Sequence, residues 1–390
     1  MEKYKNKSYY DHMNAFEPIQ PMMLRRWGTF EPVTEENIMV PLEYHENGDV
    51  TVRMYAKGAN EVHVTGGQIA VWHFDIALTN RGNGIWEGVI PASTGIIGNV
   101  VLNFIVDGSE AVNPYLPTMF YSGKIMNFIE VDDPKLDICL MRDVPHGAVT
   151  REVFWSEAVN QWIRCLVYTP PGYEKGSEYP VLYLQHGGGE NETNWIASGK
   201  VPYIMDNGIA EGKTKPFIVV MNNGMLRAPG QEGTSDFSGI EGIITKDCRE
   251  YIESKYRVLT DKWNRAIAGL SMGSMQAIYI GFRNPDLFGS VGSFTYLRCR
   301  DADNTYEGNP HLNILKDYDN FWKTYKLFFR SIGGKERNLA NSRRTTPLSR
   351  RRELRKTKLI IVMSIPVRPT TGTAGEDLLL ISASSYLSER

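Results

Sequence analysis

The 390-residue sequence predicts an α/β domain preceded by a smaller, all-β sandwich of the immunoglobulin-like kind. Two observations lead to this prediction. Short alternating segments recur in residues 35–132, and continuous apolar runs separated by helical stretches begin after residue 146. We therefore expect an N-terminal extension over 1–34, the sandwich over 35–132, a linker over 133–145 and the α/β domain over 146–390.

The strands predicted for the sandwich alternate apolar and polar side chains between turn residues, as strands with one buried face do. They cover 49–56, 61–65, 84–91 and 99–107. Trp27, Trp72 and Trp86 could stack on sugar rings, but core packing is the favoured interpretation for each.

The strands predicted for the second domain are continuous apolar runs, which are typical of a parallel sheet buried on both faces. Helices are predicted between them, over 240–255 and 274–283. The predicted strands cover 180–185, 216–221, 265–270, 288–294 and 326–332.

Charge and composition argue against several classes of protein. A formal net charge of −2 removes the electrostatic case for nucleic-acid binding, and no apolar run is long enough to span a membrane. The four cysteines, Cys139, Cys165, Cys248 and Cys299, lack the paired spacing of a zinc site, although one disulfide stays open. No metal or organic cofactor is predicted.

The most specific local pattern is Gly269-Leu270-Ser271-Met272-Gly273, between a predicted strand and a predicted helix. This is the setting of a nucleophile elbow, in which a tight turn exposes a serine at the top of the sheet. We expect the oxyanion formed by its attack to be held by backbone N–H groups of Met272 and of Gly188 in the His186–Gly189 loop. His186 is expected to brace that loop rather than to catalyse.

An acid and a histidine should follow the serine along the chain. Glu336, after the strand predicted over 326–332, is the candidate acid. No histidine follows it, since the last one in the sequence is His311. The identity of the general base is therefore open.

Residues 140–336 resemble carbohydrate esterase family 1, the feruloyl and acetyl-xylan esterases, with enterobactin esterases as relatives. The matching stretches include CLVYTPPGYE (165–174), YPVLYLQHGGGENETNW (179–195) and RAIAGLSMGSMQA (265–277). The resemblance implies an α/β-hydrolase fold, Ser271 as nucleophile and Glu336 as acid. It implies Gly188 and Met272 as oxyanion donors, and substrate binding by Gly187, Trp195 and Asn223. The N-terminal region resembles, more weakly, carbohydrate-binding modules of family 48.

The function implied is a serine esterase that releases ferulate, related hydroxycinnamates or acetate from arabinoxylan. One alternative is a siderophore lactone esterase, and another is a glycan-binding pseudo-esterase without its catalytic histidine. The expected partner is feruloylated or acetylated xylan, with the oligomeric state open. This substrate predicts secretion or a periplasmic location, although the N-terminus has no apolar signal region and a cytoplasmic location stays open.

Residues 337–390 depart from the rest of the chain. They hold nine Arg, two Lys and four acidic residues, with one aromatic residue and no His. The family pattern calls for His-[Asp/Glu]-Trp-x-x-Trp here. In an alternative frame, the codons of Pro369–Glu376 permit His-Asp-Trp followed by two residues and Trp. A frameshift over 337–390 is therefore the hypothesis for the missing histidine.

Overall fold

The structure is a computed structural model, and it describes residues 40–66, 74–82, 84–96, 98–131, 137–230, 237–294 and 310–331. The chain divides into two compact units between Asp137 and Ile138. This division falls inside the linker expected over 133–145, whose exact boundaries stay a prediction. No helix among the described residues is long and apolar enough to cross a membrane.

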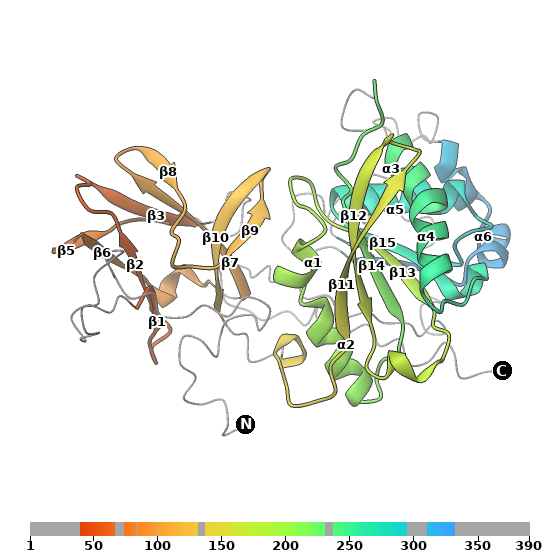
Figure 1. The fold of residues 1–390 in the computed structure, drawn as a ribbon, viewed down its shortest axis with the longest axis horizontal. Helices are drawn as coiled ribbons and strands as arrows, with labels where there is room; N and C mark the ends of the chain where they lie inside the picture. The colour runs from red at the N-terminus through yellow and green to blue at the C-terminus, as the bar shows by residue number, and fades with distance from the viewer. Residues whose placement is uncertain are drawn as a thin grey trace. The chain divides into compact units, whose positions relative to one another are not determined.

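The first unit is a sandwich of two antiparallel sheets (Figure 1). One buried cluster takes side chains from both sheets, including Val52 and Ile90 from one and Val64 and Phe104 from the other. One sheet has the order β1 (Leu42–Tyr44), β2 (Val50–Tyr55), β6 (Ile85–Ile90) and β5 (Thr79–Gly82). The other has β4 (Asp75–Ala77), β3 (Val62–Gly66), β7 (Gly98–Val106), β10 (Lys124–Val131) and β9 (Thr118–Tyr121), with β8 (Ser109–Ala111) beside β7. A 3₁₀ turn, η4 (Ala92–Thr94), follows β6.

The second unit is built on one mixed sheet of seven strands, counted over the described residues. Its first two strands form an antiparallel hairpin, and the last five run parallel to one another. The order is β11 (Ala148–Ser156), β12 (Gln161–Thr169), β14 (Ile218–Asn222), β13 (Val181–Gln185), β15 (Arg265–Leu270), β16 (Ser290–Phe294) and β17 (Leu327–Ser331). Such a sheet, with helices on both faces, confirms the predicted α/β-hydrolase class.

Helices cover both faces of this sheet (Figure 1). One face packs on α1 (Asn194–Ala197) and α2 (Val201–Ala210) through Trp195, Val201 and Met205. The other face packs on α4 (Cys248–Lys255) and α5 (Met272–Arg283). The remaining helical segments are α3 (Ser238–Gly242), the π-turn η7 (Ile243–Asp247), α6 (Tyr318–Thr324), and the 3₁₀ turns η5 (Asp137–Cys139), η6 (Tyr173–Lys175), η8 (Lys262–Asn264) and η9 (Pro310–Lys316).

The predicted strands and helices agree closely with those observed. The strand predicted over 265–270 is β15 to the residue, and the helix predicted over 274–283 begins two residues earlier, at Met272. Trp86 is 6% exposed and donates Nε1–H to the carbonyl of Ala56, which confirms its core position. Trp27 and Trp72 lie outside the described residues. Among the described residues, no disulfide involves Cys139, Cys165 or Cys248.

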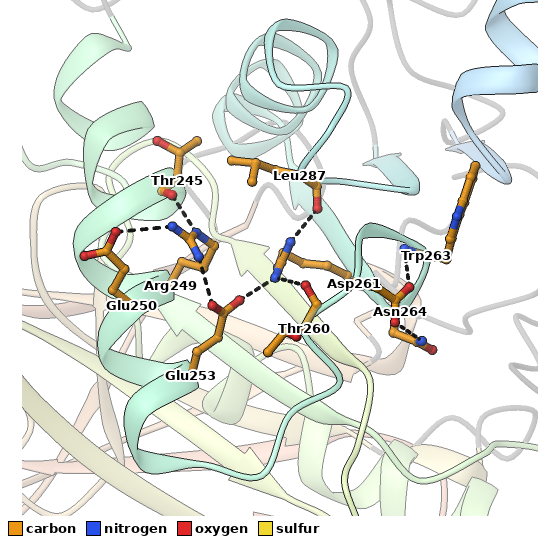
Figure 2. Close-up of polar contacts among 10 residues, drawn as sticks. Thr245, Arg249, Glu250, Glu253, Thr260, Asp261, Trp263, Asn264 and Leu287 are labelled. Carbon is orange, nitrogen blue, oxygen red and sulfur yellow. Dashed lines mark hydrogen bonds and ion pairs between the residues drawn. The ribbon is translucent and has the colours of Figure 1, made fainter.

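The strand that leads to Ser271 is held at its other end by a buried arginine, Arg265, which joins the polar network drawn around Glu253 in Figure 2. Its guanidinium forms an ion pair with Glu253 of α4 and donates to the carbonyl of Leu287 at 2.9 Å. Arg249 donates to the second carboxylate oxygen of Glu253 at 2.8 Å. A buried guanidinium needs such partners, since an unpaired buried charge is strongly destabilising. The network therefore fixes the amino end of β15 against α4.

Candidate active site

Ser271 lies in the tight turn between β15 and α5, with its side chain exposed. Its backbone has φ 51° and ψ −109°, a combination that non-glycine residues rarely adopt. The Ser271 N–H donates to the carbonyl of Phe294 at 2.9 Å, and its carbonyl accepts from Ser274 N–H at 3.0 Å. Such strain persists only where surrounding contacts impose it, and it is concentrated at functional sites.

Two glycines allow this turn to form. A Cβ on Gly273 would collide with the backbone carbonyl oxygens of Gln185 and His186, at the end of β13. A Cβ on Gly269 would collide with the backbone of Gly273 itself. Neither position needs a left-handed conformation; the requirement at both is close approach of one backbone to another. The first turn of α5 is thus packed directly on the carboxyl ends of β13 and β15.

The loop after β13 approaches the first turn of α5. A Cβ built on Gly188 would lie 3.8 Å from the Cβ of Met272, so the two residues are neighbours. Met272 is the first residue of α5, where amide groups have no acceptor within the helix. The structure therefore brings together the two residues predicted to donate to an oxyanion.

Gly187, predicted to bind substrate, has its N–H already engaged. It donates to Oε2 of Glu190 at 2.8 Å. Burial raises the pKa of Glu190, and the bond from Gly187 opposes that shift in part. The Gly187 N–H is thus already bonded within its own loop, so Gly188 remains the better candidate to donate to an oxyanion.

His186 braces this loop, as expected from the sequence. Its side chain is fully buried; Nδ1 lies 2.7 Å from the carbonyl of Gly187, and Nε2 accepts from Gly224 N–H at 2.9 Å. Nε2 must therefore be unprotonated and Nδ1 must carry the proton. Burial lowers the pKa of His186, opposed by its bond to Gly187 and by the charge of Glu192. Both ring nitrogens are in use, so this ring is not positioned as a base for Ser271.

Gln276 of α5 completes the bracing, and sequence reasoning missed it. Its Nε2 donates to the carbonyl of Gly224 at 2.8 Å, and its Oε1 accepts from Gln185 at 3.4 Å. The signal that could have identified Gln276 is a glutamine on the core face of an apolar helix. The loops after β13 and β14 are thereby fixed to the helix that follows Ser271.

The other predicted site residues are placed differently. Trp195 is 3% exposed and packs its edge against Phe294, with ring centroids 6.4 Å apart. Asn223 lies in the loop after β14, where its side chain accepts from Met225 N–H at 3.0 Å. Substrate binding by Trp195 and Asn223 stays a prediction. Glu336 lies outside the described residues.

No described histidine hydrogen-bonds to Ser271. His146 pairs with Asp206 at 2.9 Å, but it precedes β11 at the amino end of β14, opposite the end that holds Ser271. His311 packs on Tyr279, eight residues along α5 from Ser271 and therefore about 12 Å away along the helix axis. Among the described residues, no cluster of His, Cys, Asp or Glu could hold a metal ion.

Comparison with known proteins identifies the family. The family model described as "Putative esterase" matches residues 156–361, more than half of the chain. The chain belongs to this esterase family, so the prediction of a carboxylic ester hydrolase is confirmed at that level. The matched region contains Ser271, Gly188 and Met272.

Several relatives are larger enzymes. An endo-1,4-beta-xylanase/feruloyl esterase of Xylanibacter ruminicola is 38% identical over 262 residues, which cover 60% of this chain and 36% of that protein. An endo-1,4-beta-xylanase Y of Acetivibrio thermocellus is 29% identical over 34% of this chain and 13% of that protein. The chain thus spans about a third or less of the length of these relatives.

The solved structures to which this chain is similar include esterases of two kinds. A ferulic acid esterase from Anaeromyces mucronatus, in complex with ferulic acid, is 29% identical and covers 40% of this chain and 60% of its own, with a TM-score of 0.37. An enterobactin esterase from Shigella flexneri is 13% identical and covers 75% of this chain and 91% of its own, with a TM-score of 0.49.

The close packing at Gly273 generates a stability prediction. Gly273→Ala should lower the free energy of unfolding by about 2–4 kcal/mol, because the added methyl group must displace backbone rather than a flexible side chain. Gly188→Ala is the control, since its Cβ meets only an ordinary contact at 3.8 Å. Urea unfolding measures both variants. Equal stability of the two would show that α5 is not held against β13 in this way.

The buried His186 generates a pH prediction. Its pKa is lowered in the folded state, so below about pH 6.5 the unfolded chain binds a proton that the folded chain does not. The free energy of unfolding should therefore fall as the pH drops below 6.5, by up to about 1.4 kcal/mol per pH unit from this group. His186→Gln should remove that part of the slope, while His311 still contributes in both proteins. Parallel slopes for the two proteins between pH 5 and 7 would contradict a neutral, buried His186.

Proposed function

We propose that this chain is a serine esterase that releases ferulate, related hydroxycinnamates or acetate from arabinoxylan. The observation that carries the proposal is the strained Ser271 beside Gly188 and Met272, in a chain of the esterase family. The substrate class is supported by the relative from Xylanibacter ruminicola, whose name joins a xylanase to a feruloyl esterase. Arabinoxylan is a polymer that a cell meets outside its cytoplasm, so we propose a secreted or periplasmic location.

The reaction would begin with attack of Ser271 Oγ on the ester carbonyl carbon. Negative charge then develops on the carbonyl oxygen, and the N–H groups of Met272 and Gly188 would stabilise it. Collapse of this intermediate expels the alcohol of the sugar and leaves an acyl-serine. Water then hydrolyses the acyl-serine and releases the acid. Neither step requires a metal or an organic cofactor.

Proton transfer is the step for which the described residues supply no group. Serine is a weak nucleophile at its ordinary acidity and needs a base within hydrogen-bond reach. His186 is committed through both ring nitrogens, and His146 lies at the opposite end of the sheet. We propose Glu336 as the acid that would orient the imidazole of a catalytic histidine. We also propose that this histidine is missing because residues 337–390 are read in a shifted frame.

The nucleophile can be tested directly. A fluorophosphonate probe should label Ser271, and Ser271→Ala should abolish both labelling and any turnover of methyl ferulate. Loss of a triad serine can cost on the order of 10⁶ in kcat. Ser274→Ala is a matched control, because Ser274 is buried on the same helix and is hydrogen-bonded to Ser293. Turnover that survives in Ser271→Ala would exclude the proposed mechanism.

The hypothesis of a frameshift over 337–390 predicts a large difference in rate between this chain and a chain in the alternative frame. The chain as written should hydrolyse methyl ferulate only weakly, since an oxyanion hole alone leaves about 10³–10⁴-fold acceleration over water. Restoring the alternative frame, which places a histidine codon at the junction of Pro369 and Thr370, should raise kcat by several orders of magnitude with little change in KM. Single-turnover acylation compares the two proteins.

Equal and rapid acylation of the chain in its present frame and in the alternative frame would mean that the base comes from elsewhere in the chain. Turnover of enterobactin in preference to methyl ferulate would favour the lactone esterase instead. Binding of insoluble xylan without turnover in either frame would favour a pseudo-esterase.

A further inference from the structure

Two tryptophans are exposed side by side on the hairpin of β11 and β12. Trp155 is 40% exposed and Trp162 is 68% exposed. They lie directly opposite each other in the antiparallel pair, with ring centroids 5.8 Å apart and planes at 76°. Val153, on the same face of β11, is 53% exposed. Large apolar side chains gathered at a surface mark an interaction site more often than isolated ones do.

The register of the sheet places this pair at the same end of the sheet as Ser271, the end where the parallel strands finish. Cys165 of β12 pairs with Asn222, the last residue of β14, and Asn222 pairs with Gln185, the last residue of β13. Because β12 runs antiparallel to β14, Trp162 lies three residues, or about 10 Å along the strand, beyond that end of the sheet. Three spacings of about 4.8 Å separate β12 from β15 across the sheet. The indoles and Ser271 are therefore within the reach of one short oligosaccharide.

An ion pair ties this surface to the loop that carries Gly188. Arg164 projects from the same face of the hairpin as Trp162, and its Nε donates to Oε1 of Glu192. The Glu192 side chain is 2% exposed, whereas that of Arg164 is 54% exposed. The guanidinium thus keeps donors at the surface beside the indoles while it pairs with a buried carboxylate.

We propose that Trp155 and Trp162 form a stacking surface for sugar rings of the glycan that carries the ester. The C–H face of a pyranose is apolar and packs on an indole, while its hydroxyl groups can accept from an exposed guanidinium such as Arg164. The patch has only three large apolar side chains, against the roughly 20–30 residues that each partner contributes to a stable protein interface. Its size therefore suits a ligand of a few sugar rings better than a second protein.

This inference rests on the proposed esterase for the identity of the glycan, but binding itself requires no turnover. Xylohexaose is the probe, titrated calorimetrically into the full chain. Trp155→Ala/Trp162→Ala should weaken binding at least tenfold, and both side chains are exposed enough for the variant to fold. Trp263→Ala is the matched control: Trp263 is 39% exposed but lies in η8, which precedes β15 at the opposite end of the sheet.

Two readouts separate this inference from the esterase proposal. Fluorophosphonate labelling of Ser271 should be the same in the double variant and the parent chain. Loss of xylohexaose binding in the double variant alone supports the stacking surface, whether or not Ser271 is labelled. No measurable binding by the parent chain, unchanged binding in the double variant, or equal weakening in Trp263→Ala would overturn it. Self-association that disappears in the double variant would also overturn it, since the patch would then bind a second copy.

Discussion

The close approach of α5 to the ends of β13 and β15 is the constraint on which the rest of the site depends. It is possible only because Gly269 and Gly273 have no side chains where backbone meets backbone. Once α5 is seated there, Ser271 is held in its unusual backbone conformation, and the first turn of the helix lies beside the carboxyl ends of β13 and β15. The position of Ser271, the candidate nucleophile, therefore follows from this packing.

Hydrogen bonds then extend this constraint to the neighbouring loops. His186 links the loop after β13 to that after β14, and Gln276 links the second loop back to α5. Each bond satisfies a buried polar group that would otherwise be costly to remove from water. The candidate oxyanion donors are thus held by a closed set of contacts among three segments far apart in the sequence. A site preorganised in this way does not have to rearrange as charge develops.

Much of the fold could be predicted from the sequence, because parallel strands buried on both faces leave continuous apolar runs. That is why β15 was predicted to the residue and β13 within one residue. The hairpin of β11 and β12 was not predicted, since exposed residues such as Arg151 and Arg164 alternate with buried ones along its strands and interrupt any continuous apolar run. The elbow was recognisable because its glycines are local in sequence. The role of Gln276 was not, because its partners Gly224 and Gln185 become neighbours of it only in the folded sheet.

The order of strands in the second unit also bears on how it folds. β11 and β12 are joined by a short turn, so their pairing closes a small loop and can form early. β13 pairs on one side with β14 and on the other with β15, about 80 residues later in the chain, and the contact with β15 must close a long loop. The turn at Ser271 follows β15 and depends on this non-local pairing, so it cannot assemble before residues 181–270 are in place. Contact order therefore predicts that this turn forms later than the hairpin of β11 and β12, and a fragment without both β13 and β15 would lack the pairing that supports it.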